Sequence, residues 1–405
     1  MSDALRVAHY VSLSGFGGVE QHFAAFARRV AQRSDVIQTV VACSKTVHGH
    51  HADVRDICKE IAFEKKWRGI EIPRRPAMLR RLWAERTIAR QAPDVALLWN
   101  RLDQQARAID CLGAARSLYW EHGSAWLHGG DAEKQRALAA MPAVIANSLA
   151  AKRMLQLRWG YNRPIRVIPN GVRAPLAKRP RELTPGAPLR LGIAGRQIPI
   201  KGGLLAIHAL AELREQGRDA VLTVAGDGPL RDSLEALANR LGIASHVRFA
   251  GVVKDMPGFF DEIDVFVHPA LREPFGLVAA EAQSAGVPVV CTAVDGLPEV
   301  VASGQTGICV KPTADLERHA ALGGQNIGLP PKVYIPDDDA ITAPRVCEPA
   351  DLAAAIDEVT ADASAYTRTS ANAIERVAGR FDFDDHVDRV LVAVREYAES
   401  ATLRA

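Results

Sequence analysis

Short apolar runs alternate with amphipathic segments along most of the chain. They cover residues 6–13, 36–43, 93–99, 117–120, 144–146, 165–168, 189–194, 220–225, 247–250, 265–267 and 289–291. Between them apolar residues recur every three to four positions, as at Phe23, Phe26, Ala27 and Val30, which is the spacing of a helix with one buried face. Buried strands that alternate with helices predict parallel sheets covered by helices, the α/β class.

Two domains are expected from the length of the chain. A chain of 405 residues exceeds one ordinary domain, and two domains of about 150–200 residues are typical at this size. Residues 173–188 hold four prolines and charges of both signs, which is linker composition. We therefore predict a first domain over residues 1–172 and a second over residues 189–384.

The stretch at residues 268–299 organises the second domain. An apolar run leads into a loop that contains Glu273, then a helical segment that contains Glu281, then another apolar run. The loop thus lies at the carboxyl end of a strand, where parallel sheets bind ligands, and the helix N-terminus after Gly276 suits a phosphate. Taken alone, Glu273 is equally well explained as a helix cap, and Glu281 as a solvated helix residue.

A second group of polar residues follows the strand predicted at 189–194. Arg196 stands just past the strand end, and Lys201 comes shortly before the next helix. A guanidinium contacts a diphosphate with two parallel hydrogen bonds, and an ammonium adds a point charge. Ordinary surface charge is the alternative explanation for each residue alone.

The first domain carries two weaker signals. Gly17 and Gly18 lie in a glycine-rich turn between the first strand and the first helix, where bare backbone can approach a phosphate. The turn lacks the G-x-G-x-x-G pattern of dinucleotide sites, so a tight turn without a ligand stays open. His122 follows the strand at 117–120, a place where a lone histidine often has only a structural role.

The string from Glu273 through Pro274, Phe275, Gly276 and Leu277 to Glu281 resembles the donor-site signature of GT-B glycosyltransferases of family 4, the glycosyl transferases of group 1. The resemblance implies two Rossmann-like domains facing each other across a cleft, with a C-terminal helix at 385–405 crossing back to the first domain. It also implies that the donor nucleotide sugar binds mainly to the second domain and the acceptor to the first.

The resemblance also assigns roles to individual residues. It implies four catalytic residues, namely Glu273, Arg196, Lys201 and His122. It implies donor binding by Gly17, Gly18, Gly226, Val253, Phe275, Gly276, Leu277 and Glu281. In these roles Arg196 and Lys201 contact the diphosphate, Glu281 the ribose, Glu273 the sugar hydroxyls, His122 the transferred sugar, and Val253 the base through its backbone. The family is retaining and needs neither a metal nor another cofactor, and the sequence predicts no metal site of its own.

One segment departs from the family pattern. Residues 313–348 intervene before the helix expected at 351–360, where the family continues within a few residues. Insertions of this length are usually functional or mobile, so we expect a hairpin or a lid. Three consecutive aspartates in it, Asp337 to Asp339, are expected to form a solvated turn rather than a metal site.

Charge is unevenly distributed between the two halves. Residues 1–172 contain 26 Lys or Arg against 15 Asp or Glu, a net +11, and the remainder contains 24 against 32, a net −8, which together give +3. Residues 65–90 are the most basic segment, with Met78, Leu79, Leu82 and Trp83 on one helical face. Such a helix can lie on an anionic membrane, or it can pack inward on its sheet. No nucleic-acid motif accompanies the charge.

The predicted function is retaining, metal-independent transfer of a hexose from a nucleoside-diphosphate sugar, with UDP favoured and GDP as the alternative. The predicted acceptor is an anionic or membrane-associated glycan or lipid, in the synthesis of bacterial lipopolysaccharide or another cell-surface polysaccharide. We expect a cytoplasmic protein, peripheral on the inner face of the plasma membrane, because no signal-peptide pattern and no apolar run of membrane-spanning length is seen. The alternatives are a sugar-nucleotide epimerase of the same architecture and a non-enzymatic binding protein.

Overall fold

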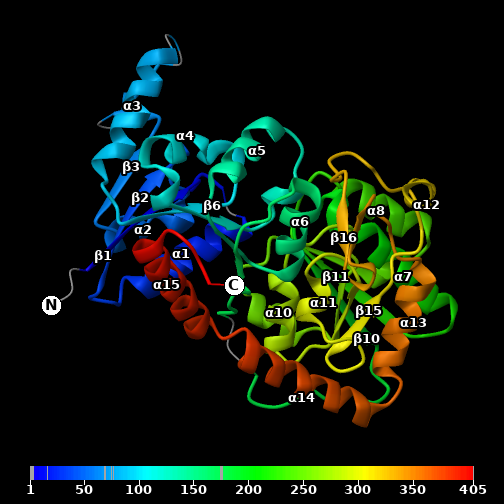
Figure 1. The fold of residues 1–405 in the computed structure, drawn as a ribbon. Coiled ribbons are helices and arrows are strands. Elements are labelled where there is room, and N and C mark those ends of the chain that lie inside the picture. The colour runs from blue at the N-terminus through cyan, green and yellow to red at the C-terminus, as the bar shows by residue number, and fades with distance from the viewer. Residues whose placement is uncertain are drawn as a thin grey trace. The chain divides into compact units, whose positions relative to one another are not determined.

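The computed structural model describes residues 4–15, 17–67, 70–73, 75, 77–173 and 177–404. These form two compact units, which we call the first unit (residues 1–169 with 384–405) and the second unit (residues 170–383) (Figure 1). The boundary falls three residues before the predicted one. Val172 belongs to the second unit because its amide donates to the carbonyl of Phe381 at 2.7 Å.

The first unit is built on a seven-stranded parallel sheet in the order β3–β2–β1–β6–β7–β8–β9. Its strands are β1 (Leu5–Val11), β2 (Val36–Ala42), β3 (Glu60–Phe63), β6 (Val95–Trp99), β7 (Ser117–Glu121), β8 (Val144–Ala146) and β9 (Ile165–Val167). Every residue of β6 and β7 is buried, which explains why they are continuous apolar runs in the sequence. A separate antiparallel pair is formed by β4 (Lys66–Trp67) and β5 (Ile70–Glu71).

Seven α-helices belong to the described part of the first unit. They are α1 (Gly18–Val30), α2 (Val54–Ile57), α3 (Ala77–Arg90), α4 (Leu102–Leu112), α5 (Asp131–Ala140), α6 (Leu149–Trp159) and the final helix α15 (Phe383–Ser400). Helix α15 packs on this unit, since Tyr397 donates its hydroxyl to the carbonyls of Ala114 and Ser117. The apolar stripe that it buries consists of Val387, Val390, Leu391, Val394 and Tyr397.

The second unit contains a six-stranded parallel sheet in the order β12–β11–β10–β13–β14–β15. The strands are β10 (Leu189–Ala194), β11 (Ala220–Ala225), β12 (Val247–Gly251), β13 (Val265–His268), β14 (Val289–Thr292) and β15 (Gly307–Val310). This is the classical doubly wound order, in which ligands bind where the order reverses, here between β10 and β13. The predicted α/β class with two Rossmann-like domains is thereby confirmed.

Helices cover this second sheet, and a small hairpin lies beside it. The helices are α7 (Gly203–Glu215), α8 (Arg231–Arg240), α9 (Met256–Asp261), α10 (Leu277–Ser284), α11 (Leu297–Val300), α12 (Leu316–Ala321), α13 (Pro349–Thr360) and α14 (Ala363–Arg380). The hairpin is made by β16 (Val333–Ile335) and β17 (Ala340–Thr342) within the inserted segment. The insertion thus contains the helix α12 and an ordered hairpin, and a hairpin is one of the two forms predicted for it.

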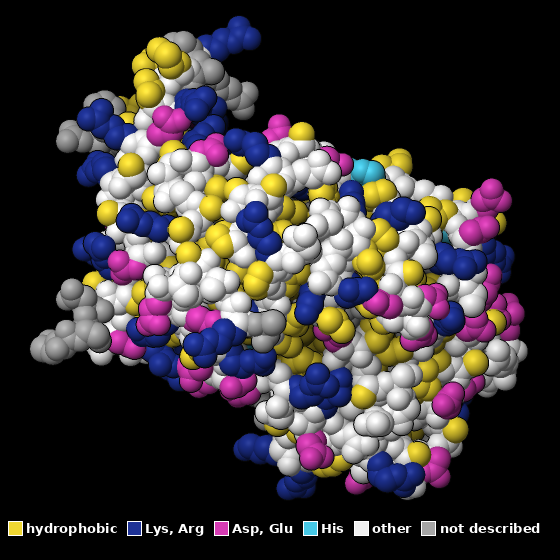
Figure 2. All heavy atoms as spheres, in the orientation of Figure 1, with side chains coloured by type: hydrophobic (Ala, Val, Ile, Leu, Met, Phe, Trp, Pro, Cys, Tyr) yellow, Lys and Arg dark blue, Asp and Glu magenta, His cyan; other side chains and the backbone are white. Residues whose placement is uncertain are grey.

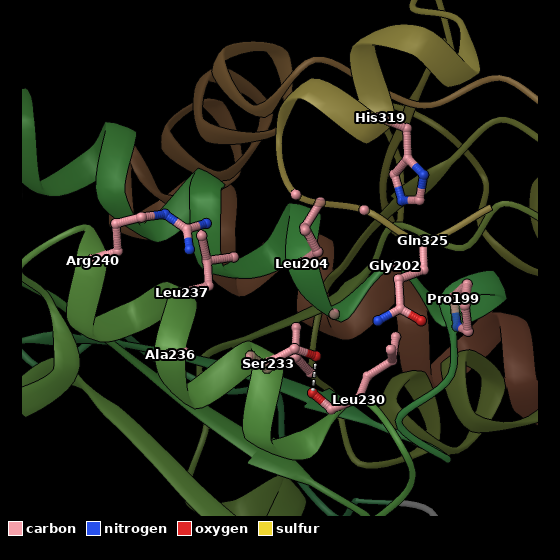
Figure 3. A pocket seen from close by; sticks show the side chains of 14 residues that line it. Pro199, Gly202, Leu204, Leu230, Ser233, Ala236, Leu237, Arg240, His319 and Gln325 are labelled. Carbon is pink, nitrogen blue, oxygen red and sulfur yellow. Dashed lines mark hydrogen bonds between the residues drawn. The ribbon is translucent and has the colours of Figure 1, made fainter. Parts of the chain in front are cut away.

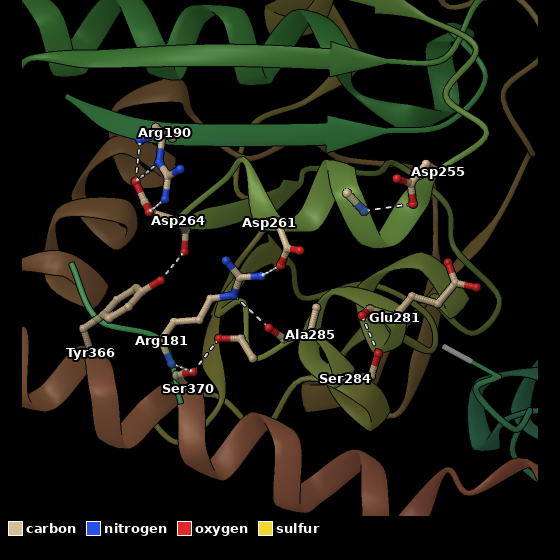
Figure 4. A network of polar contacts seen from close by, with 12 residues as sticks. Arg181, Arg190, Asp255, Asp261, Asp264, Glu281, Ser284, Ala285, Tyr366 and Ser370 are labelled. Carbon is tan, nitrogen blue, oxygen red and sulfur yellow. Dashed lines mark hydrogen bonds and ion pairs between the residues drawn. The ribbon is translucent and has the colours of Figure 1, made fainter. Parts of the chain in front are cut away.

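The predicted linker is fixed to the second unit from residue 177 onward; residues 174–176 of it lie outside the described residues. Arg181 makes the main attachment (Figure 4). Its amide donates to the hydroxyl oxygen of Ser370 at 2.8 Å, and its guanidinium donates to the carbonyl of Ala285 and to the carboxylate of Asp261 at 2.8 and 2.7 Å. This stretch follows the surface of the second unit and is not a free tether.

Helix α3 exposes three of the four apolar residues that the sequence placed on one face. Met78, Leu79 and Leu82 are 66%, 55% and 53% exposed, whereas Ala84 and Ile88 are fully buried. The helix therefore packs inward through Ala84 and Ile88, whereas Trp83 of the predicted face is half-buried and donates its indole N–H to the carbonyl of Lys66 at 3.1 Å. Figure 2 shows hydrophobic and basic side chains gathered over the outer end of α3. Residues 68, 69, 74 and 76 of the predicted basic segment lie outside the described residues.

Candidate donor and acceptor sites

Two loops of the second unit meet between β10 and β13. Gly202 has a φ of +69° and follows the short helix at Pro199–Lys201. A Cβ atom on Gly202 would lie 2.0 Å from the carbonyl oxygen of Pro269, so only glycine allows this approach. The amide of Leu271 also donates to the carbonyl of Ile200 at 2.9 Å. The loop after β10 is thus packed directly on the loop after β13.

Lys201 and Glu273 form an ion pair where these loops meet. Lys201 Nζ lies 2.6 Å from Glu273 Oε2, and His268 Nε2 lies 3.2 Å from the same oxygen. The Glu273 side chain is only 13% exposed. Burial alone would raise the pKa of the Glu273 carboxyl, but the Lys201 ammonium and the His268 hydrogen bond lower that pKa below its usual range. Glu273 is therefore a carboxylate at neutral pH.

His268 completes this group as a neutral hydrogen-bond donor. Burial lowers its pKa, although the neighbouring Glu273 carboxylate opposes the shift. A neutral imidazole carries one N–H and an ionised carboxylate only accepts, so Nε2 carries the hydrogen. His268 was not among the predicted site residues. A polar residue that closes a strand just before an acidic loop is the signal that could have identified it.

The N-terminus of α10 lies beside Glu273. Gly276 is its N-cap with a φ of +103°, and an added Cβ there would lie 3.8 Å from Glu273 Cγ. The amides that begin at Leu277 have no intrahelical acceptor, so this end presents unpaired N–H groups and partial positive charge. Phe275 is 2% exposed and packs edge-on against Phe381 with ring centroids 5.6 Å apart, which fixes the turn. This end of the helix can receive an anion.

Glu281 lies in the second turn of α10, with its carboxylate directed away from the helix (Figure 4). Burial raises its pKa to about 7, and the positive charge of Arg173 opposes the shift. No hydrogen bond to this carboxylate comes from the described residues. A carboxylate with free acceptor sites can bind a pair of ligand hydroxyls.

The carboxyl ends of β10, β11 and β12 are joined by close backbone contacts. Gly226 has a φ of +113°, and a Cβ on it would lie 2.0 Å from the carbonyl oxygen of Gly195. The Gly226 amide donates to Gly251 at 2.6 Å. Gln197 is buried and was not among the predicted site residues. Its side-chain amide donates to the carbonyl of Gly195 at 3.0 Å, and its backbone carbonyl accepts the amide of Leu230 at 3.1 Å. The predicted position Gly226 is thus tied to the loop that carries the cations.

Arg196 and Val253 stand apart from the charged group. Arg196 is exposed just past the end of β10, and its guanidinium forms no ion pair with the described residues. Val253 is half-buried in the loop after β12. The structure therefore brings Lys201 and Glu273 into contact but leaves Arg196 and Val253 as separate flanking positions of the same sheet edge.

In the first unit, His122 lies in an aromatic cluster at the end of β7. Its ring stacks on Trp99 with centroids 5.4 Å apart, and Trp120 lies 4.7 Å away. Burial lowers the pKa of His122 to about 3, with a smaller contribution from His386. The imidazole is neutral at physiological pH. Its Nε2 is buried and has no hydrogen-bond partner among the described residues.

Buried Glu121 fixes the loop that carries His122. Its carboxylate accepts the hydroxyl of Tyr119 at 2.6 Å and the amides of Gly123 and Ala125, the latter at 3.1 Å. Asn100, at the end of β6, accepts the amide of Ser124 at 2.9 Å. Polar residues at two strand ends thus hold the loop.

Gly17 and Gly18 begin α1, with Gly17 as its N-cap. Gly17 has extended backbone, and a Cβ on it would lie 2.7 Å from a carboxylate oxygen of Glu20. Glu20 thus folds back over the turn and reduces the space at Gly17. A Cβ on Gly18 would meet no atom within 4 Å. Of these two predicted positions, Gly18 leaves open space and Gly17 does not.

Two hollows lie away from these groups. One in the first unit has a volume of about 660 Å³ and four basic side chains, those of Lys45, Arg55, Lys66 and Arg90, together with Phe63 and Trp83. The other, of about 180 Å³, lies in the second unit between α7, α8 and the insertion, lined by leucines with Arg240 and Gln325 at its edge (Figure 3). Neither is lined by Glu273 or His122.

Family models match both halves of the chain. The model described as "Glycosyltransferase Family 4" matches residues 16–174, and "Glycosyl transferases group 1" matches residues 177–322. The lipopolysaccharide core biosynthesis glycosyltransferase LpsE of Rhizobium meliloti is 28% identical over 76% of this chain and 84% of its own. A GDP-mannose-dependent phosphatidylinositol monomannoside mannosyltransferase of Mycolicibacterium smegmatis is 35% identical over 32% of this chain.

The chain covers only about a third of several other curated relatives. It matches 39% of that mannosyltransferase and 33% of the D-inositol 3-phosphate glycosyltransferase of Corynebacterium efficiens. Among solved structures, HepE of Anabaena in complex with UDP and glucose has a TM-score of 0.72 at 19% identity, covering 96% of this chain and 99% of its own. WaaG, described as a glycosyltransferase involved in lipopolysaccharide biosynthesis, has a TM-score of 0.65 at 19% identity, covering 95% and 98%. These likenesses concern the fold.

Proposed function

Because the chain belongs to the group 1 glycosyltransferases of the GT-B fold, we propose that it transfers a hexose from a nucleoside-diphosphate sugar with retention of anomeric configuration. The observation that carries the proposal is the contact of Lys201 and His268 with the buried carboxylate of Glu273 at the switch point of the second sheet. A fixed cation next to a fixed anion suits a donor whose diphosphate is negative and whose sugar offers hydroxyl donors.

The leaving group is a nucleoside diphosphate, so negative charge grows on its phosphate as the glycosidic bond breaks. Lys201, Arg196 and the amides at the start of α10 from Gly276 supply the positive charge. Glu273 accepts hydrogen bonds from sugar hydroxyls and orients the donor. Glu281 accepts those of the ribose. These assignments need neither a metal nor another cofactor.

Retention follows if the acceptor attacks from the face that the phosphate leaves. The bond from the anomeric carbon to the phosphate oxygen breaks, and the bond to the acceptor oxygen forms on the same face. The donor phosphate takes the acceptor proton, so no separate enzymatic nucleophile is required. UDP is the favoured nucleotide, with GDP as the alternative.

The acceptor side of the proposal rests on the first unit. Met78, Leu79 and Leu82 of α3 are exposed apolar residues, and Arg81 of the same helix is 72% exposed. Lys66 and Arg90 line a basic hollow of the same unit. An apolar face next to cations fits an anionic membrane surface. We propose an anionic lipid or glycan acceptor displayed there on the cytoplasmic side, as in lipopolysaccharide or other cell-surface polysaccharide synthesis. No helix in the described residues is long and apolar enough to cross a bilayer.

The donor part is tested by thermal shift of the full chain with UDP, GDP, ADP and their sugars, because a ligand that binds only the folded state raises the melting temperature. We expect a shift with one nucleotide and its sugar. Activity is then measured with that donor, with and without lipid extracts as acceptor. Conversion of the donor sugar into its epimer without acceptor would replace the transferase by the epimerase alternative. No response to any nucleotide would refute donor binding.

The membrane part is tested by flotation with vesicles of phosphatidylglycerol or of phosphatidylcholine alone. We expect binding to the anionic vesicles only, and its loss in a Leu79→Glu/Leu82→Glu variant. Val392→Glu, at a residue 59% exposed on α15 of the same unit, is the matched control and should bind normally. Absence of wild-type binding to both vesicle types would remove this part and leave the donor part intact.

A further inference from the structure

Asp295 occupies an unusual position just after β14. It is fully buried, and its φ of +49° lies in the left-handed region that non-glycine residues seldom adopt. A buried carboxylate is costly unless hydrogen bonds satisfy it, and such a backbone conformation persists only where the surroundings fix it. Hydrogen bonds to neighbouring segments must therefore both satisfy the Asp295 carboxylate and fix its backbone.

The partners of Asp295 lie on two different segments. Its Oδ2 accepts the amide of Glu273 at 3.0 Å, and its Oδ1 accepts the amide of Tyr334 at 2.7 Å. In return the Asp295 amide donates to the carbonyl of Tyr334 at 2.9 Å, and the next amide, of Gly296, donates to the carbonyl of Glu273 at 3.0 Å. The Asp295–Gly296 pair thus exchanges bonds with the Glu273 loop on one side and with the inserted hairpin on the other.

Close packing makes this junction rigid. A Cβ on Gly296 would lie 2.3 Å from the carbonyl oxygen of Pro274, so the two loops touch through bare backbone. Residue 273 is therefore held at its backbone by the loop after β14. Its side chain is held separately by Lys201 and His268.

The hairpin that bears Tyr334 is itself anchored. Its Tyr334 side chain is 5% exposed, and the hydroxyl donates to Asp339 at the turn at 2.8 Å. Beyond the hairpin, Val346 and Ala314 exchange backbone bonds at 2.9 and 3.0 Å. Cys347 then contacts Thr292, the last residue of β14, at 3.5 Å. The insertion is thus fastened to the strand that leads into Asp295.

The other end of the insertion is fastened as well. Its residues Gly323 and Gln325 line the hollow against α7 and α8 (Figure 3). His208 of α7 bonds the carbonyl of Leu322 at 3.0 Å. The insertion therefore meets the body of the second unit at both ends, and its hairpin reaches Asp295 between them.

We propose that Asp295 is a positioning residue for Glu273 and that the inserted hairpin braces it. The proposal rests on the donor role given to Glu273 above. Without the carboxylate, the amides of Glu273 and Tyr334 would both lose their acceptor, and the Glu273 backbone would shift relative to Lys201. Misplacement of about 1 Å can cost about 100-fold in rate. The nucleotide half of the donor, which needs Glu281 and the α10 amides, should be affected little.

The test uses the full chain with Asp295→Asn and Asp295→Gly. Glycine tolerates the positive φ, so this variant removes the carboxylate without backbone strain. Binding of UDP and UDP-glucose, or of GDP and GDP-mannose if the wild type prefers them, is measured by calorimetry, together with kcat and KM. We expect kcat to fall about 10- to 100-fold, with nucleoside-diphosphate affinity within about twofold of wild type. Asp338→Asn, an exposed aspartate of the same insertion, is the matched control.

Hydrogen–deuterium exchange supplies a readout that needs no ligand. Peptides that contain Glu273 and Tyr334 should both lose protection in Asp295→Gly and keep it in Asp338→Asn. Unchanged protection and kcat in both Asp295 variants would overturn the proposal. An equal loss of UDP and UDP-glucose affinity would also overturn it, because the effect would then not be specific to the sugar. Failure of the proposed function is distinguishable, because it would show in the wild type as absent nucleotide binding.

Discussion

The two units each bury a histidine at the end of a central strand, but in opposite surroundings. His268 in the second unit donates a hydrogen bond to the ionised carboxylate of Glu273, which also forms an ion pair with Lys201. His122 in the first unit stacks on Trp99 and contacts the tilted ring of Trp120, and its Nε2 has no hydrogen-bond partner among the described residues. Burial lowers the pKa of both rings, yet one belongs to a charged group and the other to an aromatic one.

This difference separates two kinds of recognition. A site with fixed opposite charges can hold a phosphate and sugar hydroxyls. Removal of one charge shifts the pKa of the other group and leaves a buried charge unpaired. An uncharged ring among aromatics offers one hydrogen bond and an apolar surface, independent of pH over the physiological range. We therefore expect mutations in the charged group to have larger effects than mutations at His122.

The largest effect is expected from Lys201→Ala and Glu273→Gln. Each should lower kcat about 100- to 1,000-fold, since each removes a fixed charge that acts on the reacting donor. Lys201→Ala also leaves a buried carboxylate without its cation, so the pKa of Glu273 should rise. Steady-state kinetics and circular dichroism of both variants and the double variant measure the effect, and the double variant should be barely worse than either one.

The control for this comparison is a surface ion pair of the same unit. Arg248 and Glu262 form a salt bridge in which both side chains are 58% exposed. Exposed pairs contribute about 0–1 kcal/mol, so Arg248→Ala should leave kcat unchanged. Near-normal turnover in Lys201→Ala would contradict the assignment of the charged group to the donor.

A smaller effect is expected from His122→Phe. Phenylalanine keeps the stacking on Trp99 and the contact with Trp120 but removes both ring nitrogens, so it isolates the polar contribution of the imidazole to the proposed sugar contact. We expect kcat to fall about 10-fold, the effect of one neutral hydrogen bond. Since the pKa of His122 is about 3, the ratio of wild-type to variant kcat should be flat between pH 5 and pH 9. A ratio that changes around neutral pH would show that the ring titrates and is not the neutral group described above.

The strands and the donor helix were predictable because their signals are local. The apolar runs at 265–267 and 289–291 became β13 and β14, and Gly276 stands before α10 as expected. Their periodicity reports burial, and parallel strands buried on both faces leave a continuous apolar run. The alternation of strand and helix restricts the possible strand orders, and the order itself is seen in the structure.

The remaining features depend on contacts distant in sequence. In the sequence, Asp295 resembles an ordinary turn residue. The hydrogen bond that its carboxylate accepts from the amide of Glu273, 22 residues earlier, is seen only in the structure. Helix α3 is a second feature that its local sequence pattern does not determine. Periodicity identified the apolar face of Met78 and Leu82, but not whether any element covers it, and in the structure none of the described residues buries it.

A several-fold effect is expected from the pH dependence of donor affinity through Glu281. Its pKa of about 7 lies above the ordinary 4.5, so the carboxylate that accepts ribose hydroxyls forms as the pH rises through 7. Affinity for UDP-glucose, whose phosphates do not titrate in this range, should increase several-fold from pH 6 to pH 8. Calorimetry should find no such increase in Glu281→Gln. An equal slope in both proteins would exclude Glu281 as the titrating group.

Ionisation of Glu281 is expected to lower the stability of the fold, although it raises the affinity for the donor. The folded state binds the proton more tightly than the unfolded state, so its stability falls as the pH rises from about 4.5 through 7. Glu281→Gln removes this cost of at most about 3 kcal/mol. We expect the variant to melt higher than wild type at pH 8 and at the same temperature near pH 4.5. Lower melting of the variant at pH 8 would contradict the raised pKa.

The smallest effect is expected from removal of metal ions. In the second unit the positive charge for the diphosphate is proposed to come from Lys201, Arg196 and the amides that begin α10, which occupy the role a divalent cation takes in metal-dependent transferases. The rate should therefore stay within about twofold after dialysis against EDTA, and added Mg²⁺ or Mn²⁺ should not raise it. A large loss that Mn²⁺ restores would mean that these groups do not suffice. The charged group around Glu273 would then position the sugar while an ion carried the phosphate, and the contrast with the uncharged His122 site would concern orientation rather than charge stabilisation.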